Sequence, residues 1–132
     1  MKTIFSKIID REIPAEIIYE DEHTIVIPDR FPSMLGQLVV INKRPVPYIF
    51  DLNSDEYQAL MATTKRVAQA LDLVYDTLRT CVVIEGFEVP HVHVRLYPCR
   101  TQELVLKPRT EAGDEELKIT AAAIREKLLL IP

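Results

Sequence analysis

Residues 90–98 read PHVHVRLYP, a strict alternation of polar and apolar side chains between two prolines. Alternation predicts a β-strand, because successive side chains of a strand point to opposite faces of the sheet. The polar side chains of a strand over residues 91–97 would share one face: His91, His93, Arg95 and Tyr97. Its apolar side chains would face the core: Val92, Val94 and Leu96.

Two imidazoles and a guanidinium in one row suit phosphorus chemistry. A neutral imidazole, whose ordinary pKa is about 6.5, is a competent nucleophile near pH 7. The planar guanidinium of Arg95 matches the oxygens of a phosphate group. Because these groups repel one another and lose hydration together, a bound phosphate would offset the cost of the arrangement. The row therefore predicts a site where histidine attacks phosphorus and Arg95 stabilises the developing charge.

Two other interpretations of this row remain open. The strand could simply expose polar side chains to solvent. Alternatively, His91 and His93 could chelate one metal ion. A carboxylate or third histidine is missing where the row continues, because Tyr97 and Pro98 follow. The sequence therefore favours a site without metal.

Further strands are predicted on both sides of this row. Apolar, β-branched composition marks four of them: residues 16–20, 23–28, 37–43 and 79–84. Asp21 and Glu22 form the turn between the first two, and residues 29–36, with proline and glycine, form a loop. Residues 85–90 turn the chain into the histidine strand.

One long amphipathic helix is predicted over about residues 54–76. Asn53 and Glu56 have capping-box spacing, and apolar side chains then recur at helical intervals. A second helix is expected over about 114–129, and a short helical turn over 3–11. Strands, a long helix, more strands and a terminal helix indicate an α+β fold with a mostly antiparallel sheet.

Length and charge limit the classes of function. The chain has 132 residues, which suits one domain over residues 1–132, and 48% of them are hydrophobic. The net charge of −4 argues against an extended nucleic-acid surface, which needs an excess of basic residues. A pocket for a single nucleotide stays compatible with this charge.

The sequence also predicts the cellular compartment of the protein. No apolar run approaches the roughly 20 residues of a membrane span, and charged residues interrupt the first fourteen positions, so we expect neither membrane contact nor a signal peptide. Cys81 and Cys99 do not make a disulfide framework. We therefore expect a cytoplasmic protein with reduced thiols.

The sequence resembles the histidine triad (HIT) family, whose motif is His-φ-His-φ-His-φ-φ with φ hydrophobic. The motif stands here as His91-Val-His93-Val-Arg95-Leu-Tyr97. The segment DRFPSMLGQLVVINK, residues 29–43, is similar to the family's Asp-x-x-Pro-x-x-x-Gly-His-x-Leu-Val-Ile-x-Lys. The opening residues 4–29 resemble the family's short helix and hairpin. The resemblance covers about residues 4–100 and implies a HIT-like fold with a C-terminal extension.

The resemblance implies a role for each matching position. His93 would be the nucleophile that forms a covalent nucleotidyl-histidine, and His91 would support the geometry of the site. Asp29 would accept hydrogen bonds from ribose hydroxyls. The implied nucleotide-binding set is Ile27 and Arg30 at the base, Asp29 at the ribose, Gln37 at the position of a family histidine, and the backbone N–H groups of Glu88 and Val89 at the phosphate.

The chain departs from the family pattern at several positions. Arg95 replaces the third histidine, which keeps affinity for phosphate and loses a proton donor worth about 10²–10⁴ in rate. Gln37 replaces a histidine, and Glu88 replaces the serine or threonine that assists the leaving group. Thr3 and Ser6 replace the cysteine pair that forms a zinc site in some bacterial members.

Two functions follow from these expectations. The first is a nucleotide hydrolase or transferase that acts on a nucleoside phosphoramidate or a dinucleoside polyphosphate. The second is a nucleotide-binding protein that has lost turnover, as the replacements at Arg95 and Gln37 suggest. An AMP-like ligand is expected in both cases, with no metal and no cofactor. The resemblance also implies a homodimer built by pairing sheets and long helices.

Overall fold

The computed structural model describes residues 2–132. The strands are β1 (Tyr19–Glu20), β2 (Thr24–Pro28), β3 (Leu38–Asn42), β4 (Arg79–Val83) and β5 (His93–Cys99). The helices are α1 (Ile4–Ile9), the 3-10 turn η1 (Ile49–Asp51), α2 (Ser54–Tyr75) and α3 (Asp114–Leu128). No helix within residues 2–132 is both long enough and apolar enough to cross a membrane.

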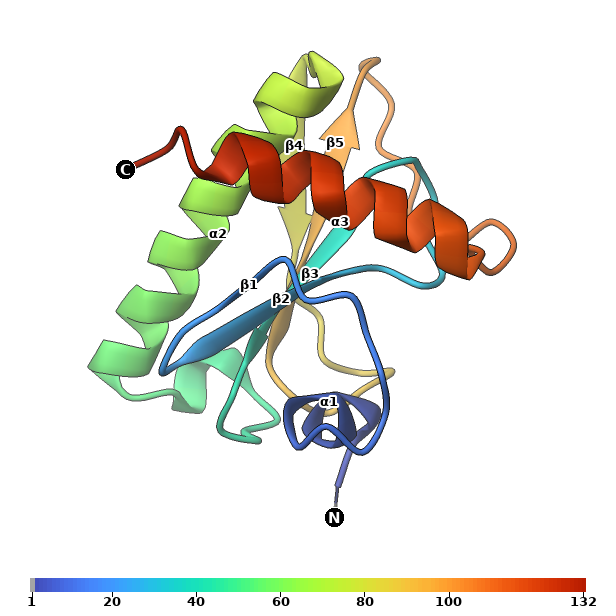
Figure 1. Cartoon of the computed structure of the whole chain (residues 1–132). Coiled ribbons are helices and arrows are strands. Elements are labelled where there is room, and N and C mark those ends of the chain that lie inside the picture. Colours follow the sequence, from blue (N-terminus) through green and yellow to red (C-terminus); the bar gives the residue numbers. More distant parts are fainter. Residues whose placement is uncertain (1) are drawn as a thin grey trace.

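The strands form one sheet in the order β1-β2-β3-β5-β4, and every neighbouring pair is antiparallel. Helices α2 and α3 cover one face of this sheet, and α1 lies at the opposite side near its lower end (Figure 1). The expected α+β fold with an antiparallel sheet is confirmed. The histidine strand β5 lies between β3 and β4, which makes it an interior strand.

The alternation of β5 divides the sheet into two apolar layers. Val94 and Leu96 face α2 and α3, where they join a core that includes Leu71 and Ile124. On the other face, α1 packs Phe5 and Ile8 against side chains of β2 and β3: Ile25, Ile27, Val39 and Ile41. Burial of apolar side chains on both faces is worth roughly 25 cal/mol per Å². The sheet that contains β5 is therefore enclosed between two packed apolar layers.

Two predicted boundaries are corrected by the structure. The first strand is limited to two residues rather than 16–20, and only Tyr19 and Glu20 pair with β2. The histidine strand begins at His93 rather than His91. The N–H of His91 donates to the carbonyl of Val89 at 2.8 Å, which turns the chain just before the strand.

The end of β3 is tied to the start of α2 by hydrogen bonds to the buried carboxylate of Glu56. Arg44 donates to both oxygens of the Glu56 carboxylate, at 2.8 and 2.7 Å, and Asn42 donates to the same carboxylate at 3.3 Å. The Arg44 guanidinium lowers the pKa of Glu56 to about 2 against the opposing effect of burial. Glu56 also completes the capping box with Asn53 that the sequence predicts.

The loop between β2 and β3 depends on Gly36. Its φ of +90° lies in the left-handed region that residues with a Cβ rarely adopt. A Cβ at this position would overlap the ring of Tyr75, whose Cζ would be 2.8 Å away. The loop leads directly from Asp29 to Gln37, whose carbonyl accepts the Asp29 N–H at 2.9 Å.

We predict that Gly36→Ala lowers the free energy of unfolding by at least about 2 kcal/mol, because backbone strain and the overlap with Tyr75 add. Gly113→Ala is the matched control, since Gly113 has a φ of −72° and no atom within 4 Å of an added Cβ. The control should cost less than about 1 kcal/mol. Urea denaturation of both variants measures the difference, and equal costs would contradict the role given to Gly36.

Candidate active site

The face of β5 that carries the site is the face covered by α1. His93 pairs with Ile41, and Arg95 pairs with Val39. The ring of Phe5 from α1 meets the His93 ring edge-on, with 4.8 Å between centroids. His93 and Arg95 therefore share one face, as the alternation predicts.

The tautomer of His93 is fixed by its own strand. His93 Nδ1 lies 2.7 Å from the carbonyl oxygen of His91. A carbonyl only accepts, so Nδ1 carries the proton and Nε2 of the neutral ring keeps its lone pair. Nε2 is buried and has no hydrogen-bond partner within the described residues, and the residue is 1% exposed. A buried nitrogen without a partner is the geometry expected of a nucleophile that awaits an electrophile.

His91 precedes β5 and faces α1, with 5.9 Å between its ring centroid and that of Phe5. Its Nε2 lies 2.6 Å from the carbonyl oxygen of Asn42 and must donate to it. Its Nδ1 therefore accepts, and the hydroxyl of Thr3 donates to it at 2.9 Å, with Ser6 Oγ at 3.5 Å. His91 thus shares one face with His93, but it is fully buried and both of its nitrogens are bonded inside the protein.

Burial keeps both histidines neutral. Loss of hydration lowers the pKa of His91 and of His93 below the usual value for histidine. For His93, the hydrogen bond to the His91 carbonyl opposes this effect, the Arg95 charge adds to it, and Glu85 opposes it. A neutral imidazole is the form that can act as a nucleophile.

A cavity of about 660 Å³ opens beside this row. Six residues that the sequence singles out line it: Ile27, Asp29, Arg30, Glu88, Val89 and Arg95. Helix α1 adds Ile4, Phe5 and Ile8, and α3 adds Asp114, Leu117 and Lys118. The C-terminal helix, which lies outside the matched motifs, thus forms part of the wall. We call this cavity the large cleft.

Three residues of the predicted set do not line the large cleft. His91 is bonded away from it, Gln37 is buried behind Asp29, and His93 lies behind Phe5 and Arg95. The cavity therefore ends at the side chains that neighbour His93. A ligand that reaches Nε2 has to move at least one of them.

Asp29 is the centre of a polar network. Its Oδ2 accepts from Gln37 Nε2 at 2.8 Å and from Arg95 Nε at 3.3 Å. Its Oδ1 accepts the N–H of Phe31 at 3.0 Å. The two replacements of family histidines therefore converge on one oxygen. A carboxylate offers about four acceptor positions, so Asp29 keeps one free at Oδ1 for a ribose hydroxyl.

Glu85 is a site residue that the sequence reasoning missed. Its Oε1 forms an ion pair with Arg95 Nη1 at 3.3 Å, and its Oε2 accepts the N–H of Phe87 at 2.6 Å. Burial alone would raise the pKa of Glu85, but the N–H groups of Phe87 and Glu88 and then the charge of Arg95 lower it overall. In the sequence Glu85 is only a carboxylate at the start of the loop over residues 85–90.

The described residues do not assemble a metal site. No cluster of three or more histidine, cysteine or acidic side chains that could hold an ion occurs in the described part of the chain. His91 has no lone pair left, because Nε2 donates to Asn42 and Nδ1 accepts from Thr3. Thr3 and Ser6, which replace a cysteine pair, hold the histidine with hydroxyl groups instead.

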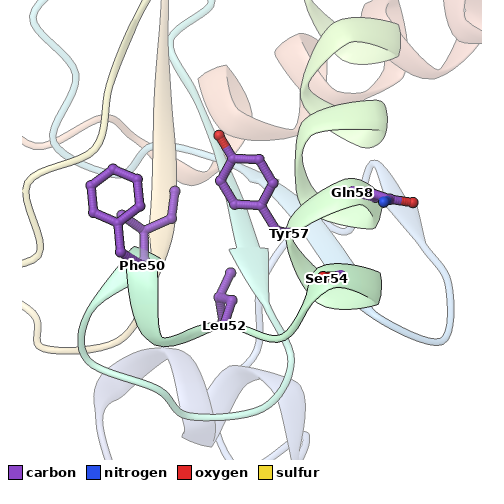
Figure 2. Close-up of a pocket in the computed structure, with 6 residues that line it drawn as sticks. Phe50, Leu52, Ser54, Tyr57 and Gln58 are labelled. Carbon is purple, nitrogen blue, oxygen red and sulfur yellow. The ribbon is translucent and has the colours of Figure 1, made fainter.

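A second hollow of about 260 Å³ lies between η1 and the start of α2. Figure 2 shows Phe50 and Tyr57 on either side of it with Leu52 beneath, while Gln58 points away. No charged side chain lines it. The charged side chains that can bind an anionic ligand line the large cleft instead.

Comparison with known proteins agrees with this geometry. The family model described as HIT domain matches residues 10–102. A HIT-like protein of Chlamydia pneumoniae is 37% identical over 101 residues, covering 71% of this chain and 90% of the relative. Purine nucleoside phosphoramidase of Escherichia coli is 31% identical over 101 residues, covering 72% of this chain and 85% of the enzyme.

A solved structure agrees over a longer span. The crystal structure of a hypothetical histidine triad nucleotide-binding protein from Sulfolobus tokodaii superimposes with a TM-score of 0.85 at 25% identity. The superposition covers 96% of this chain and 91% of that protein. The likeness therefore extends beyond the matched residues 10–102 to most of the chain.

We predict that His93 is protonated at Nδ1 and His91 at Nε2, and that both titrate below about pH 6.5. Because the unfolded chain binds protons at higher pH than these buried rings, the free energy of unfolding should fall as the pH drops below about 6.5. Nitrogen-15 NMR of the imidazoles at several pH values measures both properties. A His93 ring protonated at Nε2 at pH 7.5 would contradict the assignment.

We predict that Thr3→Val costs about 1–3 kcal/mol of stability, because it removes the α1 cap and leaves His91 Nδ1 with only the distant Ser6. Thr3→Ser keeps the hydroxyl and should stay within about 0.5 kcal/mol of the parent. Denaturant unfolding of the two variants makes the comparison. A Thr3→Val variant as stable as the parent, with the loss confined to Thr3→Ser, would show that the methyl group and not the hydroxyl matters.

Proposed function

The chain belongs to the HIT domain family, and we propose that it binds a nucleotide in the large cleft and transfers the nucleotidyl group through His93. The substrate would be a nucleoside phosphoramidate or a dinucleoside polyphosphate, with a purine as the base. The observation that carries the proposal is the neutral His93 ring, whose unpartnered Nε2 lies buried beside a cleft of about 660 Å³.

The chemistry would proceed in two displacements. The lone pair of His93 Nε2 attacks phosphorus, a P–Nε2 bond forms, and the P–N or P–O bond to the leaving group breaks with its electron pair. The leaving group takes a proton from solvent or from a nearby acid, because the guanidinium of Arg95 is not deprotonated in proteins. Water then attacks phosphorus, the P–Nε2 bond breaks, and neutral His93 returns as the water proton is released.

The cleft would recognise the nucleoside through its walls. Ile27 and Phe31 offer apolar surface for a base, and Arg30 lies at the same wall. The remaining acceptor position on Asp29 Oδ1 suits one ribose hydroxyl. The enzyme of Escherichia coli named for purine nucleoside phosphoramidates supports the choice of substrate class.

A second candidate function is nucleotide binding without turnover. The observation in its favour is that Arg95 occupies the third histidine position and is held by two carboxylates, Asp29 and Glu85. In this arrangement no side chain of the motif can give a proton to the leaving group. Binding of AMP without turnover of any phosphoramidate would select this function.

We also propose that the protein is a cytoplasmic homodimer. β4 is an edge strand with one neighbour, and Val82 on it is 44% exposed. Leu73 of α2 and Leu78 before β4 are also exposed. Pairing of this edge with a second copy would satisfy its free backbone groups and cover these side chains. Light scattering at several concentrations measures the mass in solution.

We predict that His93→Ala reduces turnover of adenosine 5′-phosphoramidate by at least about 10³-fold, because it removes the nucleophile. AMP binding should change by less than about threefold, since the cleft walls remain. Release of ammonia and AMP is followed by a coupled assay.

The matched control is His23→Ala, which removes the histidine before β2 that is 37% exposed at its side chain and far from the cleft residues. Turnover in this variant should equal that of the parent. If His93→Ala and His23→Ala have equal rates, His93 is not the nucleophile.

A further inference from the structure

The Glu85 carboxylate is held as a bound anion would be. Its Oε2 accepts the N–H of Phe87 at 2.6 Å, and its Oε1 accepts from Nη1 of Arg95 at 3.3 Å. A backbone N–H group and a guanidinium are donors that proteins use for phosphate oxygens. Glu85 itself is only partly exposed, with 30% of its side chain accessible.

These donors lie where the phosphate of a ligand is expected. Arg95 belongs to the row predicted to face phosphorus, and Phe87 precedes Glu88 and Val89, whose backbone N–H groups are expected to bind the phosphate. In the structure Arg95 and the N–H of Phe87 both donate to Glu85 instead. A phosphate that takes these donors must therefore displace the carboxylate or bind beside it.

The charges around the large cleft strengthen this competition. Its walls carry four carboxylates, those of Glu16, Asp29, Glu88 and Asp114, and three cations, those of Arg30, Arg95 and Lys118. Arg30 lies 3.4 Å from Asp114, and Arg95 is shared between Asp29 and Glu85. Among the described residues, only Lys118 of these cations lacks an ion-pair partner within 4.0 Å. The cleft therefore holds little free positive charge for a highly charged ligand.

We propose that Glu85 is a specificity-determining residue that makes the cleft favour phosphorus groups with a low negative charge. The Glu85 carboxylate pairs with Arg95 in the free protein and repels each further negative charge that approaches this guanidinium. A singly charged phosphoramidate or phosphate diester meets less repulsion than a doubly charged monoester. The inference rests on the proposed function, since Arg95, the partner of Glu85, lines the same cleft.

Isothermal titration calorimetry with three probes at pH 8 tests the proposal: adenosine without charge, the methyl ester of AMP with one charge, and AMP with two. Glu85→Gln keeps the shape of the side chain and removes its charge. AMP affinity should rise about tenfold, the gain for the methyl ester should be about threefold, and adenosine affinity should not change. The gain thus grows with the charge at phosphorus.

Glu103→Gln is the matched control, because it removes the same charge from an exposed residue that does not line the large cleft. The AMP affinity of this variant should rise less than threefold. An equal gain in both variants would show a general charge effect and overturn the proposal, as would an unchanged AMP affinity in Glu85→Gln.

The two proposals fail in different ways. If the parent and both variants bind neither AMP nor adenosine, the proposed function is wrong, and this inference falls with it. If the parent binds AMP and adenosine and Glu85→Gln gives equal gains for both, only the inference about Glu85 is wrong. A greater gain for AMP than for its methyl ester supports it.

Discussion

The hydrogen bond from His93 Nδ1 to the carbonyl oxygen of His91, 2.7 Å long, is the interaction on which the site depends. It decides which nitrogen of His93 carries the proton and therefore which one can attack. The carbonyl is itself fixed, because the His91 ring is bonded to Asn42 on one side and to Thr3 on the other. An imidazole held in this way has lost its rotational freedom before any ligand arrives, which would lower the entropic cost of the proposed reaction.

The polar part of the site surrounds this fixed ring. Gln37 and Arg95 replace two histidines of the family pattern, and both donate to Oδ2 of Asp29. A guanidinium in place of an imidazole brings a permanent charge, and Glu85 provides a second carboxylate for it. The replacements are therefore linked through Asp29, and neither can be understood as a change at one position. The same ion pairs that satisfy Arg95 restrict its availability to a ligand.

The sequence predicted the fold better than the site. Alternation in residues 91–97 and the capping box at Asn53 are local signals, and the structure confirms the strand and the helix that they predict. The hydrogen-bond partners of His91 could not be predicted, because Thr3 and Asn42 are distant from it in sequence. Glu85 gave almost no signal, since its role depends on backbone N–H groups that only a folded loop brings together. Contacts of this kind are not encoded in residue type or spacing.

The crystal structure of the protein with AMP tests the account most directly, because it gives the distance between phosphorus and His93 Nε2. We predict about 3–3.5 Å, with the phosphorus facing the lone pair of a ring that is still bonded to the His91 carbonyl through Nδ1. A phosphorus atom more than about 5 Å from Nε2, with the ring still covered by Phe5, would contradict the role of His93 as nucleophile.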